Sequence, residues 1–187
     1  MAPSRRDHLV DTALELFVRD GFHATGIDKI LAESGVAKMT LYKHFKSKDE
    51  LILSALRRRD ERFRNWFMRA VESRAQAPRQ RLLAIFDALD EWFSGRDFNG
   101  CMFINASAEF ARPDDPIHVA AAEHLRLVLA YVRELATAAG ARDAEALARE
   151  LMLLAEGAIV MAHVAGQADA AKNARRAART LVDHALA

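Results

Sequence analysis

The sequence has little of what a disulfide-stapled, metal-binding or membrane-spanning chain requires. Its single cysteine, Cys101, cannot form an internal disulfide, and no cysteine and histidine residues have the spacing of a structural zinc site. The longest apolar stretch, residues 151–166, carries Glu156 and His163. It is shorter than the roughly 18 to 20 residues that span a membrane. The basic first residues lead into an amphipathic pattern, so we expect no secretory signal. We therefore expect a soluble, cytoplasmic protein with no metal, no cofactor and no membrane partner.

Glycine and proline are also scarce, with 8 and 4 residues, whereas 51% of the chain is hydrophobic. This composition can bury a sizeable core and argues against disorder. Apolar residues recur at helical spacing along the chain, and no stretch alternates as a strand would, so the predicted fold class is all-α. Hydroxyl and carboxylate residues three apart predict helix starts at Ser4, Thr25 and Ser47, and Gly21 and Gly35 are predicted helix ends.

The later helices are predicted from their apolar stripes and from breaks at glycine and proline. A long helix is expected over residues 48–76, before Pro78, and an apolar stripe follows over residues 82–93. A short helix is expected over 101–110, and longer ones over 117–139, 143–165 and 169–186.

Positive charge is concentrated in residues 36–48, which hold four lysines, one histidine and no acid. This window carries a formal charge of +4, although the whole chain sums to +1. Val36, Leu41 and Phe45 can face inward at helical spacing, which leaves a basic outer face. Two short helices joined by the Gly35 turn form a helix-turn-helix, and the basic face on the second helix is typical of a phosphate-binding surface.

The residues Gly21 to Thr25, Ile30, Gly35–Val36 and above all Thr40 to Leu51 resemble the N-terminal domain of the TetR (tetracycline repressor) family. The stretch Phe98 to Phe110 is similar to a segment in one subset of that family. The resemblance implies a homodimeric bacterial transcription regulator, usually a repressor, whose C-terminal helical domain binds a small molecule that lowers DNA affinity.

The predicted domains are therefore a three-helix DNA-binding domain, residues 1–47, and a helical effector-binding and dimerisation domain, residues 48–187, which begins with a connecting helix over 48–76. Gly26, Leu31 and Ser34 depart from the family pattern. An effector is expected to shift the connecting helix as a lever and so to change the separation of the two recognition helices.

The expected partner is double-stranded DNA, read by the N-terminal residues of the second helix in the major groove. Lys38, Met39 and Thr40 are placed at base edges, with Lys43 next to them. Phosphate contacts are expected from a second set of side chains: Thr25, Tyr42, His44 and Lys48. The alternative is that Tyr42 and His44 cover the small core and that the lysines form a solvated face.

One short recognition helix buries too little surface for strong specific binding, so a symmetric dimer on a near-palindromic operator is expected. The helix over residues 143–165 is apolar almost all round, and the last helix is rich in alanine. We expect these last two helices to form the homodimer, the alternative being a central helix in a monomeric bundle.

A small-molecule effector, apolar or aromatic, is expected in the C-terminal domain, because an apolar wall with a few polar groups makes a ligand pocket. The candidate pocket residues are Trp92, Phe98, Cys101, Phe103, Asn105, Glu109, His124, Tyr131, Glu156 and His163. Each of them has an alternative as a core residue or a satisfied buried polar group.

Three other functions remain as alternatives. Cys101, at a predicted helix start, could be a reactive thiolate that senses oxidants or electrophiles, or a small buried apolar residue. An architectural DNA-binding protein without an effector is a second possibility. A helical small-molecule enzyme has little support, because the chain lacks a nucleophile motif, a phosphate loop and a metal-spaced histidine pair, so we predict that the chain is not an enzyme.

Overall fold

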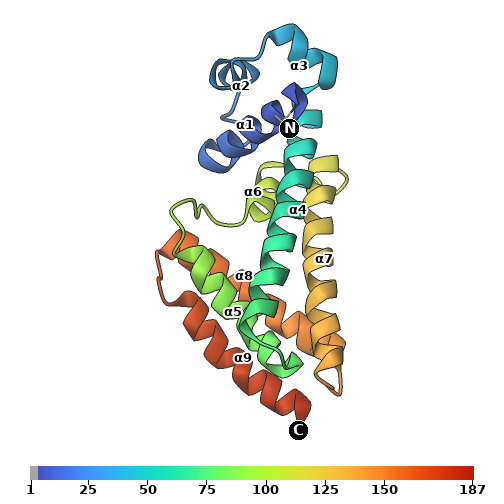
Figure 1. Cartoon of the computed structure of the whole chain (residues 1–187), viewed down its shortest axis with the longest axis vertical. Helices are drawn as coiled ribbons and strands as arrows, with labels where there is room; N and C mark the ends of the chain where they lie inside the picture. Colours follow the sequence, from blue (N-terminus) through green and yellow to red (C-terminus); the bar gives the residue numbers. More distant parts are fainter. Residues whose placement is uncertain (1–3) are drawn as a thin grey trace. The chain divides into compact units, whose positions relative to one another are not determined.

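The computed structural model describes residues 4–187, and over this range the regular secondary structure is helical (Figure 1). The helices are α1 (Arg5–Asp20), α2 (Ile27–Ser34), α3 (Lys38–His44), α4 (Lys48–Arg74), α5 (Pro78–Phe93), α6 (Met102–Glu109), α7 (Pro116–Ala138), α8 (Ala144–Ala165) and α9 (Ala170–Leu186). The predicted all-α fold is confirmed. None of these helices is long and apolar enough to cross a membrane.

The chain divides into two compact units, and the first of them is discontinuous in sequence. Unit 1 combines the described residues up to Arg62 with Met102–His124, and unit 2 combines Phe63–Cys101 with Leu125–Ala187. Helix α3 ends at His44, and the compact unit that contains the helix-turn-helix also includes the first part of α4, α6 and the start of α7, so it extends beyond the predicted domain of residues 1–47.

Two of the three predicted helix starts are confirmed. Ser4 accepts a hydrogen bond from the Asp7 amide, and Ser47 accepts one from the Glu50 amide at 3.2 Å. The predicted cap at Thr25 is wrong, because α2 begins one residue later with Gly26 as its N-cap. Gly35 ends α2 in the left-handed conformation, with φ of 66°, which a residue without a Cβ adopts at little cost.

Helix α3 has seven residues, too few to be stable without tertiary contacts. Its inward side chain, Leu41, is fully buried, and Phe45 at the end of the helix is 2% exposed. Helix α3 contacts α1, and the residues buried in α1, the following turn and α2 include Leu9, Val10, Ala13, Leu16, Phe17, Phe22 and Ile30. Its contacts with α1 and the burial of Leu41 and Phe45 therefore fix where α3 lies.

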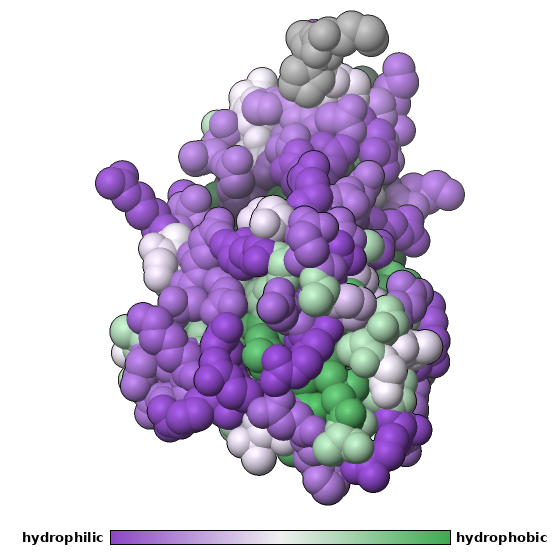
Figure 2. Space-filling model, turned by 60° about the horizontal axis from the view of Figure 1, so that its bottom comes forward, coloured by the Kyte–Doolittle hydropathy of each residue, from purple (hydrophilic) through white to green (hydrophobic). Residues whose placement is uncertain are grey.

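In unit 2, α5, α8 and α9 pack against one another. Helix α9 presents its small side chains inward, and the buried ones are Ala170, Ala171, Ala174, Ala178 and Val182. Helix α8 buries one face, but several large apolar side chains remain exposed: Leu153, Val160, Met161 and Val164. Figure 2 shows hydrophobic side chains at the surface, among hydrophilic ones, on the face that it brings forward.

Leu41 and Met39 offer a matched test of this packing, because they lie in the same helix and differ in burial, at 0% and 86% exposed. Leu41→Ala should lower the free energy of unfolding of unit 1 by about 2–5 kcal/mol, because it leaves a cavity in the core. Met39→Ala should change it by less than about 0.5 kcal/mol. Urea titration followed by circular dichroism measures both values, and equal effects would contradict the assigned inward face.

Candidate DNA interface and effector cavity

The outer face of α3 presents a compact set of basic and polar side chains. Lys38, Lys43 and His44 are exposed, Met39 is 86% exposed and Tyr42 is 48% exposed. Thr40 is half-buried, as is Lys48 at the first position of α4. The structure therefore brings seven of the eight predicted DNA contacts together on α3 and at the start of α4.

Lys38 has a weak intramolecular partner. Its Nζ lies 3.6 Å from Asp28 Oδ1, and the two side chains are 62% and 90% exposed. An ion pair this open to water contributes little stability, so the ammonium can exchange this carboxylate for a DNA group.

Thr25, the eighth predicted DNA contact, lies differently. Its side chain is fully buried, and its hydroxyl donates a hydrogen bond to the Gly21 carbonyl at 2.7 Å. The residue thus closes the turn between α1 and α2 from the inside.

Charged side chains connect α4 to α1. The Arg58 guanidinium donates to Asp11 Oδ1 at 3.0 Å and also pairs with Asp7, while Arg62 contacts Asp11 at 2.8 Å. Hydrogen bonds from Ser4 and Arg58 hold the pKa of Asp7 below its usual range. Arg58 is 21% exposed in this network, so α4 and α1 are held together by a partly buried ion pair.

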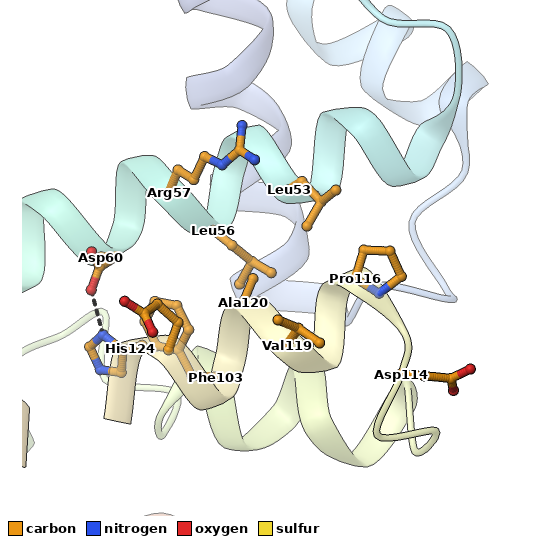
Figure 3. Close-up of a pocket in the computed structure, with 11 residues that line it drawn as sticks. Leu53, Leu56, Arg57, Asp60, Phe103, Asp114, Pro116, Val119, Ala120 and His124 are labelled. Carbon is orange, nitrogen blue, oxygen red and sulfur yellow. Dashed lines mark hydrogen bonds and ion pairs between the residues drawn. The ribbon is translucent and has the colours of Figure 1, made fainter. Parts of the chain in front are cut away.

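A cavity of about 620 Å³ lies between α4, α6 and α7 (Figure 3). We call it the α4–α7 cavity, and its lining residues are Leu53, Leu56, Arg57, Asp60, Phe103, Asp114, Pro116, Val119, Ala120, Glu123 and His124. Figure 3 shows that α4 and α7 supply the apolar wall and that Asp114 points away from it. This volume and this mixture of groups suit a small organic ligand.

The polar end of the α4–α7 cavity contains a buried pair. His124 is 4% exposed, and its Nδ1 lies 2.8 Å from Asp60 Oδ1. Phe103 stacks on the His124 ring, with 3.7 Å between the ring centroids and 10° between the planes. Phe103 and His124, both predicted pocket residues, therefore lie side by side at this cavity.

Three predicted pocket residues form a separate aromatic cluster in unit 2. The rings of Trp92 and Phe98 meet edge to face at 5.1 Å, and Phe98 meets His163 in the same way at 6.0 Å. His163 lies directly over the chain at Gly100, where an added Cβ would come within 2.7 Å of the ring. Cys101 follows, with 6% of its surface exposed.

Tyr131 and Glu156 line two further cavities in unit 2. The Tyr131 hydroxyl is buried without a hydrogen-bond partner among residues 4–187, and burial, together with the Glu72 carboxylate, raises its pKa to about 12. Glu156 Oε2 has no partner in the same range either, and it lies in an apolar groove of about 460 Å³ with Leu125, Leu129 and Leu153. Burial raises the pKa of Glu156 to about 7.

Asn105 and Glu109 share one face of α6, as predicted, but Glu109 contacts the helix-turn-helix. Its carboxylate accepts hydrogen bonds from the Phe22 and His23 amides. The predicted pocket residues are thus distributed over several places in the two units.

Sequence reasoning missed much of the cavity wall. Leu53, Leu56 and Asp60 were not predicted as pocket residues, although their spacing of three and four residues places them on one face of α4. This periodicity was the available signal, but it does not show which segment covers the face.

A small basic helix held on a buried core by two preceding helices defines a helix-turn-helix DNA-binding protein. A family model described as "Bacterial regulatory proteins, tetR family" matches residues 9–55, and one described as "Tetracyclin repressor-like, C-terminal domain" matches residues 78–178. The second match alone covers more than half of the chain. The chain belongs to the TetR family of transcriptional regulators, which bind DNA and are not enzymes. The family membership that the sequence motifs predict is thus confirmed.

The chain is also similar to individual members of the family. It shares 31% identity with SCO4454, a TetR-family regulator from Streptomyces coelicolor, with a TM-score of 0.91 over 100% of this chain and 92% of that one. It is 24% identical over 155 residues to the Escherichia coli regulator YjdC, covering 83% of this chain and 81% of that protein. It is 40% identical over 84 residues to the transcriptional activator FasR of Mycolicibacterium smegmatis, covering 45% of this chain and 38% of that protein. Regulators of this family typically dimerise.

The buried Glu156 carboxyl predicts a pH-dependent stability. Its pKa is raised to about 7, so the folded state holds the proton more tightly than the unfolded state. Stability should therefore fall as the pH rises toward 7 and remain lowered above it. Relative to wild type, Glu156→Gln should be about 2 kcal/mol more stabilising at pH 8 than at pH 5.

Urea unfolding at the two pH values tests this expectation. Glu150→Gln, at an exposed position on the same helix, is the matched control. If the difference in unfolding free energy between Glu156→Gln and wild type were the same at both pH values, the raised pKa of Glu156 would be contradicted.

Proposed function

We propose that this protein is a cytoplasmic repressor that binds a near-palindromic operator as a homodimer and releases it when a small apolar or aromatic molecule binds. The observation that carries the proposal is the exposed face of α3, where Lys38, Met39 and Lys43 project from a helix fixed by buried Leu41. Lys38 can donate to guanine acceptors, and Met39 can contact a thymine methyl group.

Phosphate contacts surround this face in the proposal. The Tyr42 hydroxyl, His44 and Lys48 are arranged along α3 and the start of α4, where oriented amides favour anions. Thr40 joins the base-reading residues at the first turn of α3. Thr25 contributes by fixing the turn that precedes α2, since its hydroxyl is engaged inside the unit.

Dimerisation through α8 and α9 is supported by the apolar face that α8 leaves uncovered. Leu153 and Val164 are 76% and 77% exposed, and Val160 and Met161 lie between them. Gly157, on the same stretch, has open space around it. A second copy that covers this face would remove apolar surface from water, and it would place two recognition helices on one duplex.

The α4–α7 cavity is the effector site in this proposal. Leu53, Leu56 and Val119 offer an apolar wall, and the Asp60–His124 pair offers polarity at one end. The sensor alternative through Cys101 gains no support from its burial, because reactive thiols are partly exposed.

Selection of bound sequences from a random double-stranded DNA pool at about 0.15 M salt tests the DNA-binding role, because non-specific contacts are weakened there. We expect a near-palindromic consensus. Lys38→Ala should relax the preference at one position of each half-site by about 1–3 kcal/mol. Lys48→Ala should weaken binding to all sequences to a similar degree. It should also reduce the slope of the logarithm of the binding constant against the logarithm of salt concentration by about one.

Arg96→Ala removes one positive charge at an exposed position between α5 and α6, away from the proposed dimer helices, and should leave both properties unchanged as the control. The absence of any enriched sequence would reject sequence-specific binding. A reporter gene whose promoter overlaps the selected operator then shows whether the protein lowers or raises transcription. Increased transcription in the presence of the protein would show an activator and contradict the proposed repression.

Filling the α4–α7 cavity should block an apolar aromatic probe. Ala120→Phe adds a ring to the cavity wall and should weaken saturable binding of 1-anilinonaphthalene-8-sulfonate at least about tenfold, since the lost pocket contacts are worth over 1.4 kcal/mol. Ala138→Phe, at the exposed last residue of α7 and outside the cavity lining, is the control. Fluorescence titration measures both affinities, and unchanged binding by Ala120→Phe would place the probe outside this cavity.

A further inference from the structure

The carboxylate of Glu109, the last residue of α6, binds the turn between α1 and α2. Its Oε1 accepts a hydrogen bond from the Phe22 amide at 2.9 Å. Its Oε2 accepts one from the His23 amide at 2.6 Å and lies 2.7 Å from His23 Nδ1. Both oxygens are thus engaged by residues more than 80 positions earlier in the chain.

The next residue, Phe110, adds apolar contacts to the same turn. Its ring stacks on His23, with centroids 4.9 Å apart, and meets Phe22 edge to face at 6.0 Å. Phe22 is 1% exposed and stacks in turn on Phe17 of α1. The end of α6 therefore holds the turn by polar and aromatic contacts together.

The electrostatics favour an ionised Glu109. Partial burial disfavours its charge, but hydrogen bonds from the Phe22 and His23 amides and from the His23 side chain outweigh it and hold the pKa of Glu109 below its usual range. The carboxylate also leaves little room at Gly21, where an added Cβ would lie 3.1 Å from Oε1 and φ is 86°. The residues of the turn, Gly21 to His23, therefore all lie close to this carboxylate.

The two ends of α6 face two different sites. Near its start, Phe103 lines the α4–α7 cavity and stacks on His124. At its end, Glu109 holds the turn that leads directly into α2 and then α3. Helix α6 is only eight residues long, so Phe103 and Glu109 lie in one short, continuous helix.

We propose that the contacts of Glu109 with the Phe22 and His23 amides, which we call the Glu109 latch, transmit occupancy of the α4–α7 cavity to the recognition helix. This proposal rests on the proposed function, because it takes that cavity as the effector site. The Arg58 ion pairs, which join α4 to α1, are a second connection to the same DNA-binding helices. In this proposal the Glu109 latch therefore works in addition to any movement of α4.

Amide hydrogen exchange over residues 21–34 tests the latch without DNA or effector. Glu109→Gln places an amide NH₂ where a second acceptor is required and should speed exchange in this segment at least about threefold. His23→Ala keeps the backbone amides and should cause a smaller change of the same sign. Glu15→Gln, at an exposed position of α1, is the control for the loss of one negative charge. The exchange rate of the α9 amides is the control for global destabilisation.

A double-mutant cycle tests transmission along α6. Phe103→Leu should speed exchange over residues 21–34 when Glu109 is present, and it should have a clearly smaller effect in the Glu109→Gln background. Equal effects of Phe103→Leu in both backgrounds, or unchanged exchange in Glu109→Gln, would overturn the proposal. A DNA selection without a consensus would reject the proposed function but would leave this measurement valid.

Discussion

The position of the recognition helix depends on the burial of two side chains, Leu41 and Phe45. A helix of seven residues does not hold its shape alone, so the core under α3 determines its orientation. Arg6 adds to this anchor, because its guanidinium lies over the Phe45 ring at 5.2 Å. Substitution of the exposed residues of α3 should cost little stability, because the buried Leu41 and Phe45 hold the helix in place.

Four carboxylates in unit 1 are engaged with partners inside the unit. Asp7 and Asp11 pair with Arg58, Glu50 accepts from the Lys46 amide, and Glu109 accepts from the turn after α1. Helix α3 itself contains no acidic residue. These four acids are engaged away from α3, and the exposed lysines of α3 have one weak acidic partner, Asp28 at 3.6 Å from Lys38, so the approach of a polyanion is favoured although the whole chain is nearly neutral.

Local features of the structure followed from the sequence, and distant pairings did not. The Ser47 cap and the bounds of the last three helices agree with the expectation within one residue, because caps and apolar periodicity are encoded over a few positions. Periodicity shows which face of a helix is buried, but not which segment covers it. Glu109 was therefore placed in a pocket, and the partner of His124, Asp60, was missed. Thr25 has the pattern of a cap, yet its buried hydroxyl donates to the Gly21 carbonyl, and Gly26 is the N-cap of α2.

The discontinuity of unit 1 has a consequence for recombination between members of the family. A chimera joined at the end of the helix-turn-helix motif, near residue 47, would take α1 to α3 from one parent and Met102–His124 from another. Glu109 and Phe110 would then meet a foreign turn in place of Phe22 and His23. We therefore expect that a transplant of the DNA-reading helices of this chain has to include the segment around α6, although more than 50 residues separate the two pieces in the chain.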